Sequence, residues 1–129
     1  MSHEPIPLET ERVATEVIGG AIDVHLELGP GFLEKIYQEA LCLELDARNI
    51  PFERERSIAV YYRGVAIPGQ RIDLVVAGCL LVELKAAGRL DAFHEAKVIS
   101  YLRTTNLRLR LLLNFNARTM KEGLRRIAL

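Results

Sequence analysis

Hydrophobic positions recur at helical spacing in the first third of the chain. From about Glu9 to Leu28 apolar side chains return every three or four residues, which predicts an amphipathic helix that Gly29-Pro30-Gly31 ends. A second helix is predicted from about Phe32 to Asn49, just before Pro51. Its expected buried side carries Leu33, Ile36, Tyr37, Ala40 and Leu41. Residues 1–8, which contain two prolines, are expected to form an extended N-terminal arm.

The pattern becomes strand-like after Pro51. Runs rich in Val, Ile, Leu and Tyr predict strands from about Glu53 to Tyr62, from Gln70 to Val76 and from Leu80 to Ala86. Arg63-Gly64 is expected to form a turn after the first of these strands, and Ala77-Gly78 to join the second strand to the third.

The last third of the chain returns to alternating element types. A helix is predicted from about Asp91 to Thr104, and a strand with one buried face from about Leu107 to Phe115. A last short helix is predicted from about Arg118 to Ile127. Hairpin strands followed by a helical crossover predict a single α/β domain, residues 9–129, with a mixed sheet flanked by helices.

Two of the predicted strands carry charges on one face only. Because successive strand side chains point to opposite faces, Arg71 and Asp73 lie opposite the apolar face of one strand, and Glu83 and Lys85 opposite that of the next. A two-residue turn would place Asp73 across from an apolar residue. A one-residue offset, which Gly78 permits through a bulge or a three-residue loop, pairs Asp73 with Glu83 and Arg71 with Lys85. We expect the offset register.

Paired carboxylates beside an amine indicate a particular chemistry. Two carboxylates a few ångströms apart repel each other, and a hard divalent cation, which prefers oxygen ligands, removes that cost. Lys85, two residues beyond Glu83, would then stabilise charge that develops on a phosphate. Asp73 and Glu-x-Lys therefore predict a magnesium site for phosphodiester hydrolysis. The alternative is an ordinary solvated strand, since exposed cross-strand ion pairs contribute little.

The composition limits the kinds of partner that the protein can bind, but it does not decide among them. The 17 basic and 17 acidic residues cancel, which excludes a nucleic-acid binder driven by net charge but leaves room for a local basic patch. Basic residues gather in the last quarter of the chain, where they form either solvated faces or a phosphate-contacting rim. They are Arg103, Arg108, Arg110, Arg118, Lys121, Arg125 and Arg126.

The cysteines and the lengths of the apolar runs bear on where in the cell the protein is expected. Cys42 and Cys79 stand alone in apolar runs, which predicts buried thiols in a cytoplasmic protein. Every apolar run is far shorter than the ~18 residues that a spanning helix needs, so we expect no membrane partner.

Several motifs together resemble a known family. Asp73 with Glu83-Leu84-Lys85 resembles the signature of the PD-(D/E)XK nuclease superfamily, and the stretch from Gly31 to Tyr37, GFLEKIY, matches the pattern that names the GxxExxY proteins, a branch of that superfamily. Further matching pieces are Val24-His25, Leu28-Gly29-Pro30-Gly31, His94-Glu95-Ala96, Tyr101-Leu102 and Leu111-Leu112-Leu113-Asn114-Phe115. Together they cover about residues 11–126.

The resemblance implies a restriction-endonuclease-like core, in which a helix precedes a three-stranded antiparallel meander, a helix and a further strand. It also implies that Asp73 and Glu83 ligate Mg²⁺ or Mn²⁺, with the Leu84 carbonyl as a third ligand. Lys85 would be the catalytic cation, and Glu34 would be an additional acidic ligand.

The chain departs from this pattern at two positions. Lys97 stands where the resemblance leads us to expect Gln, and Ile72 stands where the superfamily name has Pro. The positive charge of Lys97 either contacts the phosphate, which would add it to the catalytic residues, or pairs with Glu34 or Glu83 and competes with the metal.

These observations lead to two functional hypotheses. The first is a magnesium-dependent nuclease that hydrolyses phosphodiester bonds in DNA or RNA, with a homodimer supplying two sites. The second is a catalytically inactive nuclease fold that binds nucleic acid or a protein partner, which the zero net charge and Lys97 favour. An ordinary charged sheet in a structural protein is a third interpretation.

The remaining motif residues have structural as well as functional interpretations. Tyr37 is predicted to pack in the core with a hydrogen-bonded hydroxyl, and His25 to be a satisfied structural histidine rather than a catalytic one, with the turn at Gly31 as one available partner. For His94 a place in the cleft and a structural place stay open. Gly29-Pro30-Gly31 is predicted to be a helix stop rather than a phosphate cradle, because no strand precedes it.

Overall fold

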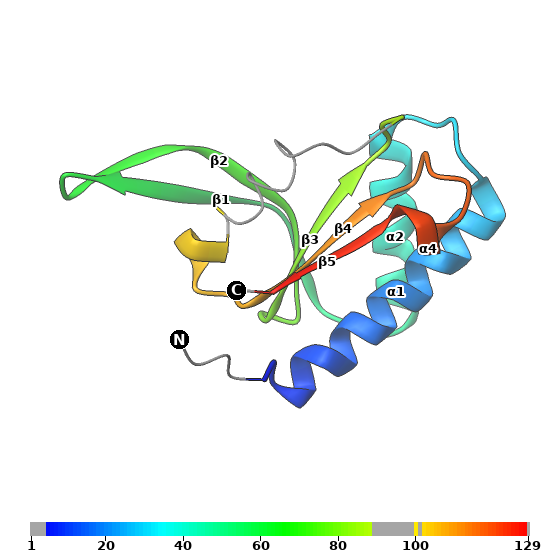
Figure 1. The fold of residues 1–129 in the computed structure, drawn as a ribbon, viewed down its shortest axis with the longest axis horizontal. Helices are drawn as coiled ribbons and strands as arrows, with labels where there is room; N and C mark the ends of the chain where they lie inside the picture. The colour runs from blue at the N-terminus through cyan, green and yellow to red at the C-terminus, as the bar shows by residue number, and fades with distance from the viewer. Residues whose placement is uncertain (1–4, 89–99, 101, 129) are drawn as a thin grey trace.

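The computed structural model describes residues 5–88, 100 and 102–128, and its strands form one five-stranded sheet in chain order (Figure 1). The elements are α1 (Leu8–Leu28), α2 (Glu34–Ala47), β1 (Phe52–Tyr62), β2 (Val65–Val76), β3 (Leu80–Lys85), β4 (Leu109–Asn114), α4 (Met120–Gly123) and β5 (Leu124–Ala128). The first three strands are antiparallel, β4 runs parallel to β3, and β5 runs antiparallel to β4. This confirms the predicted mixed sheet of a restriction-endonuclease-like core.

Helices α1 and α2 cover one face of the sheet (Figure 1). Every second residue of β3, from Leu80 through Leu84, packs against them in the main core. The two helices lie close together, since a Cβ on Gly20 would lie 3.5 Å from Cβ of Glu44. Arg48 ties them at the surface through bonds to Glu16 Oε2 at 2.7 Å and to Asp23 Oδ2 at 2.8 Å, so α2 is held firmly beside the sheet.

The helix ends agree closely with the prediction. Helix α1 begins at Leu8, one residue inside the expected N-terminal arm, and ends where Gly29 takes a φ of 67°, a conformation that glycine adopts without strain. The predicted helix stop at Gly29-Pro30-Gly31 is therefore confirmed.

The predicted buried side of α2 is partly wrong. Leu33 and Ile36 are exposed, and the buried residues of the helix are Tyr37, Gln38, Leu41, Cys42 and Leu45. Because the helix begins only at Glu34, the residues that face the sheet follow Tyr37 at intervals of four, and Leu33 stands outside the first turn. Gln38 thus has a polar amide on the buried side.

Strand β4 is buried on both faces, not on one as the alternation predicted. It lies between β3 and β5, and Arg110, expected either on a solvated face or in a phosphate-contacting rim, is completely buried. Leu102 packs on the sheet face opposite α1 and α2, with Val75 and Leu81. Residues 102–105 are helical, whereas most of the helix predicted from Asp91 to Thr104 lies outside the described residues.

The helix predicted from Arg118 to Ile127 is wrong. Thr119 caps a four-residue helix, α4, by accepting a bond from the Glu122 amide at 3.2 Å, and the chain then continues as β5. The edge of β4 offers unpaired backbone groups, and pairing from Leu113 with Leu124 to Leu109 with Ala128 satisfies them. Gly123 is required at the junction, because a Cβ there would lie 2.2 Å from Asn114 O.

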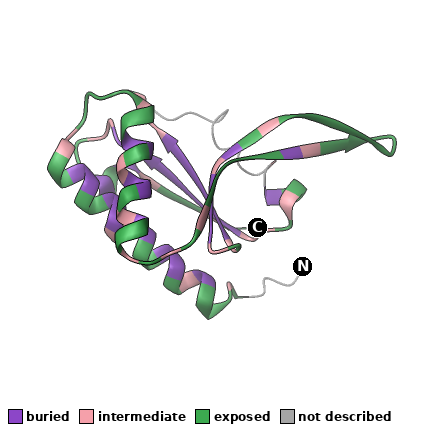
Figure 2. Ribbon diagram, turned by 180° about the vertical axis from the view of Figure 1, so that it is seen from behind, coloured by how far each residue is buried: buried purple, intermediate pink, exposed green. Residues whose placement is uncertain are grey.

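The ribbon of β1 and β2 extends far beyond the rest of the sheet (Figure 2). We call residues 57–70 the outer ribbon; it includes the predicted turn at Arg63-Gly64, and β2 starts at Val65, five residues earlier than expected. A register shift between Ile58 and Val60 marks a β-bulge in this part. Ile72 packs in the second cluster with Val75 and not with Leu74, so the predicted apolar face of β2 is interrupted at Asp73.

Both cysteines are free thiols. Cys42 lies in the core, where burial raises the pKa of its thiol. Cys79 lies in the turn before β3 and is only partly buried, so the prediction of two buried thiols is correct for Cys42 alone.

Candidate active site

The register between β2 and β3 brings the two motif acids opposite each other. The ladder pairs Val76 with Leu80 and Leu74 with Val82, and this register sets Asp73 opposite Glu83, one step beyond the last paired residues. The connection is the predicted three-residue loop, residues 77–79, with φ of 67° at Gly78. The expected offset register is therefore confirmed.

At Asp73 and Glu83, hydrogen bonds from backbone amides to carboxylates take the place of backbone–backbone bonds between β2 and β3. The Asp73 amide donates to Glu83 Oε1 at 3.1 Å, and the Leu84 amide donates to Asp73 Oδ2 at 2.8 Å. Each acid thus accepts a bond from a backbone amide that the pairing of the two strands would otherwise use. Such reciprocal bonds fix both side chains where the two strands meet.

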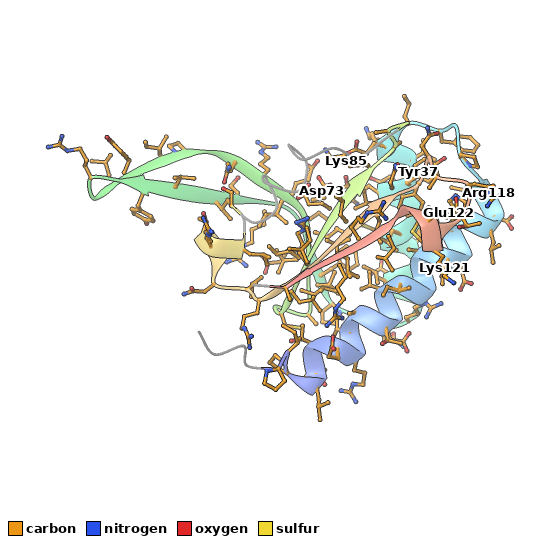
Figure 3. The ribbon with its side chains drawn as sticks, viewed as in Figure 1. Tyr37, Asp73, Lys85, Arg118, Lys121 and Glu122 are labelled. Carbon is orange, nitrogen blue, oxygen red and sulfur yellow. The ribbon has the colours of Figure 1, made fainter. Side chains whose placement is uncertain are left out.

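The two acids border a polar hollow of about 410 Å³, which we call the site hollow. Its lining residues are Glu34, Glu55, Gly69, Gln70, Arg71, Asp73, Glu83 and Lys85. Glu83 is buried, whereas Asp73, Lys85 and Glu34 are half-buried. Figure 3 shows Asp73 and Lys85 on neighbouring strands at the same end of the sheet. The structure thus brings together four of the five predicted site residues; Lys97 lies outside the described residues, as does His94.

Glu34 reaches the hollow from the first turn of α2, and Tyr37 fixes the loop that leads into it. The Tyr37 hydroxyl donates to Gly29 O at 2.6 Å and accepts from the Phe32 amide at 3.1 Å. Its ring stacks on Phe115 with centroids 4.6 Å apart. The prediction that Tyr37 packs in the core with a bonded hydroxyl is confirmed, and its spacing from Glu34 has a physical reason: the tyrosine anchors the turn that carries the acid.

His25 is a buried residue with a hydrogen-bond partner, as predicted for a structural histidine. Its ring is buried, and Nε2 lies 2.8 Å from the carbonyl oxygen of Ala117 rather than bonding at the turn near Gly31. The bond connects α1 with the loop before α4, which lies away from the site hollow.

Three residues that line the site hollow were not predicted from the sequence: Glu55, Gly69 and Gln70. Glu55 lies between Arg54, paired with Leu74, and Arg56, paired with Ile72, and so opposite Asp73. Its φ of 47° bends the ribbon at that point. A β2 that begins at Val65 sets the register with β1, and that register, which the residues of the segment alone do not reveal, brings Glu55 opposite Asp73.

A second polar hollow of about 510 Å³ adjoins the first, and we call it the side hollow. Its lining residues are Glu34, Lys35, Gln38, Glu39, Arg54, Glu55 and Asp73. Arg54 and Glu39 form an ion pair at its rim. The hydrogen bond from Arg54 lowers the pKa of the Glu39 carboxyl, and the same bond raises the pKa of the Arg54 guanidinium.

The donor set of the site hollow fits a hard divalent cation in its chemistry. Asp73, Glu83 and Glu34 offer carboxylate oxygens, the ligands that Mg²⁺ and Mn²⁺ prefer, around one wet hollow. Among the described residues, no group of three or more His, Cys, Asp and Glu side chains is already arranged to hold a metal ion. The acids would therefore have to move together on binding.

The basic residues of the last quarter lie elsewhere. Arg118 pairs with Glu122 at 2.7 Å, and Arg126 pairs with Glu11 at 2.6 Å, whose carboxyl pKa the arginine lowers. The described cations that line the site hollow are Arg71 and Lys85. These pairs favour the solvated interpretation for Arg118 and Arg126.

Comparison with known proteins identifies the class. A family profile described as the PD-(D/E)XK nuclease superfamily matches residues 11–127, and the chain belongs to this superfamily. No curated protein and no solved structure gives a significant match to the chain. Within the described part of the chain, no helix is both long enough and apolar enough to cross a membrane.

Proposed function

We propose that this protein is a nuclease of the GxxExxY branch that hydrolyses phosphodiester bonds in DNA or RNA with Mg²⁺ or Mn²⁺. The observation that carries the proposal is the pair of reciprocal bonds between Asp73, Glu83 and the β2–β3 backbone, which points both acids into one hollow beside Lys85. Membership in a nuclease superfamily supports the same reaction class.

Each residue has a distinct role in this proposal. Asp73, Glu83, Glu34 and the Leu84 carbonyl would hold the ion, which when bound supplies positive charge to the phosphate and acidifies a water. Lys85 orients the attacking water and stabilises the negative charge that develops on the phosphate oxygens. Lys97 would contact the phosphate, and Arg71, exposed at the entrance, would contact the backbone of the substrate.

The test compares Asp73→Ala with Asp46→Ala, an exposed aspartate of α2 that lines neither hollow. Mg²⁺ and Mn²⁺ are titrated by calorimetry, and plasmid DNA, single-stranded DNA and RNA are then incubated with each protein. We expect the wild type and Asp46→Ala to bind metal and cleave, and Asp73→Ala to lose at least about 100-fold in rate.

The same experiment decides between the proposal and its alternatives. Metal binding by the wild type without cleavage of any substrate would favour a nuclease fold that binds nucleic acid or protein without catalysis, which the zero net charge of the chain also favours. An absence of metal affinity would favour an ordinary charged sheet.

We also propose that the protein acts in the cytoplasm as a homodimer paired through the outer ribbon. Cross-strand partners share a face, so Val60 with Ile67 and Tyr62 with Val65 make one exposed apolar stripe. Arg63 is the single charged residue in the sequence of the outer ribbon, residues 57–70, so each copy brings only one positive charge to such an interface. Light scattering should give twice 14.5 kDa for the wild type and a monomer for Tyr62→Lys.

A further inference from the structure

The side hollow contains a buried polar group that the fold leaves unused. Gln38 is 8% exposed and lines this hollow, and its amide makes no side-chain hydrogen bond within the described part of the chain. The Gln38 amide atoms are not among the side-chain atoms that are both fully buried and unpartnered, so the amide faces the hollow and is open to a ligand there. An amide at the wall of a hollow is therefore an observation that points to a ligand.

The charged residues that line the side hollow with Gln38 indicate the chemical class of the ligand. The described residues that line the hollow include four carboxylates and two cations, Lys35 and Arg54, and Arg54 is already paired with Glu39. A phosphate would be repelled from such a surface. A neutral heterocycle that donates hydrogen bonds would be favoured, because carboxylates accept from exocyclic amino groups, and a glutamine amide presents a donor and an acceptor side by side.

The position of the hollow connects it to the proposed reaction. Glu34, Glu55 and Asp73 line both hollows, so the side hollow opens directly onto the place where the scissile phosphate would lie. A volume of about 510 Å³ lies within the ~300–1,000 Å³ of small-ligand sites. Arg54, which Glu39 holds in place, offers a guanidinium plane on which a base can stack.

We propose that the side hollow binds one unpaired nucleobase that carries an exocyclic amino group, next to the phosphodiester that is cut. The inference rests on the proposed function and adds a substrate preference to it. Adenine fits best, because its amino group and N7 match the two ends of the Gln38 amide. Thymine and uracil have no amino group to donate and are disfavoured. The base must be unpaired, because in a duplex its amino group is engaged with the opposite strand.

The experiment measures binding without cleavage. Fluorescent eight-residue strands dA8, dT8, rA8 and rU8 are titrated in EDTA against the wild type, Gln38→Leu and Gln70→Leu; Gln70 lines the site hollow but not the side hollow. We expect the wild type to bind the adenine strands about tenfold tighter than the pyrimidine strands. Gln38→Leu should bring that ratio close to one by weakening adenine binding, and Gln70→Leu should preserve it. Comparison of dA8 with rA8 shows whether DNA or RNA supplies the base.

A thermal melt separates recognition from a structural role. Leucine fills the same space without an unpartnered amide, so Gln38→Leu should melt at the wild-type temperature or above it. Equal affinity of the wild type for all four strands, no binding of any strand, an unchanged ratio in Gln38→Leu or a lower melting temperature in that variant would each overturn the inference. Because no metal is present, a failure of cleavage in the earlier test does not affect this result.

Discussion

The two halves of the β1–β2 ribbon differ sharply although the same two strands form them. In the inner half Leu74, Val75 and Val76 are at most 1% exposed, whereas in the outer ribbon Val65 is 63% exposed and Ile67 50%. Alternating apolar side chains occur in both halves. What differs is the cover: β3, α1 and α2 enclose the inner half, whereas Ile58 is the one residue of the outer ribbon that joins a buried cluster, together with Leu81 and Leu102.

The boundary between the halves is the candidate site. Asp73 and Glu55 lie where the ribbon leaves the sheet, and there the regular ladder between β2 and β3 gives way to bonds from carboxylates to backbone amides. Acids at this point have a rigid sheet behind them and water in front, which is the combination that a metal-binding site requires. The position of the candidate site therefore depends on where the packed sheet ends as much as on the motif residues.

The largest effect should come from truncating matched leucine and isoleucine side chains in the two halves. Leu74→Ala removes a fully buried side chain from the main core and should lower the free energy of unfolding by about 2–5 kcal/mol. Ile67→Ala, in the outer ribbon, should change it by no more than about 0.5 kcal/mol. Urea unfolding of a dilute sample measures both.

A change in protein concentration serves as the control for this experiment. If a second copy covers the outer ribbon, the effect of Ile67→Ala should grow as the protein concentration rises, whereas that of Leu74→Ala should not change. Equal losses for the two variants in dilute solution would show that the outer ribbon packs on the body, and the contrast between the halves would then be abandoned.

The next effect compares two tyrosines. Tyr37→Phe keeps the ring on Phe115 but removes the hydroxyl that bonds to Gly29 O and the Phe32 amide, and should cost about 1–3 kcal/mol. Tyr61→Phe removes a hydroxyl from a side chain that is 72% exposed and should be neutral. Thermal melts measure the loss, and cleavage rates should fall for Tyr37→Phe because the turn carries Glu34. An unchanged melt for Tyr37→Phe would mean that the loop is held by other contacts.

Much of this arrangement could be predicted from the sequence, because local rules decide it. The offset register at Asp73 and Glu83 follows from strand alternation and a glycine in the loop, and α1 ends where Gly29 permits it. The errors share a different cause. Strand β5 exists because the edge of β4 needs a partner, and the long β2 exists because β1 pairs with it. Neither need can be read from the residues of the segment itself.

The residues of the candidate site divide in the same way, into those that local rules predict and those that tertiary contacts position. Glu34, Asp73, Glu83 and Lys85 were found through motif spacing, and all four line one hollow. Glu55 and Gln38 were missed, because their positions depend on contacts across the sheet and on which side of α2 is buried. Neither residue stands out by type in the sequence, since acids and amides are common on solvated faces.

The smallest effect concerns acid stability and tests the inner half alone, because the sequence of the outer ribbon contains no carboxylate. Arg54 of β1 bonds Glu39 of α2 and lowers the pKa of that carboxyl from its ordinary value of 4.5. A carboxyl whose pKa is lower in the folded state stabilises the fold above its unfolded pKa, and this stabilisation is lost as pH falls through the folded value. Between pH 6 and roughly pH 3, wild-type stability should therefore fall more steeply than that of Glu39→Gln, with a small difference because the pair is exposed.

Glu11→Gln, which breaks the pair with Arg126 of β5, is the matched control, and the two substitutions should add in the double variant. Parallel pH profiles for the wild type and Glu39→Gln would show that the Arg54 bond does not anchor the ribbon to α2.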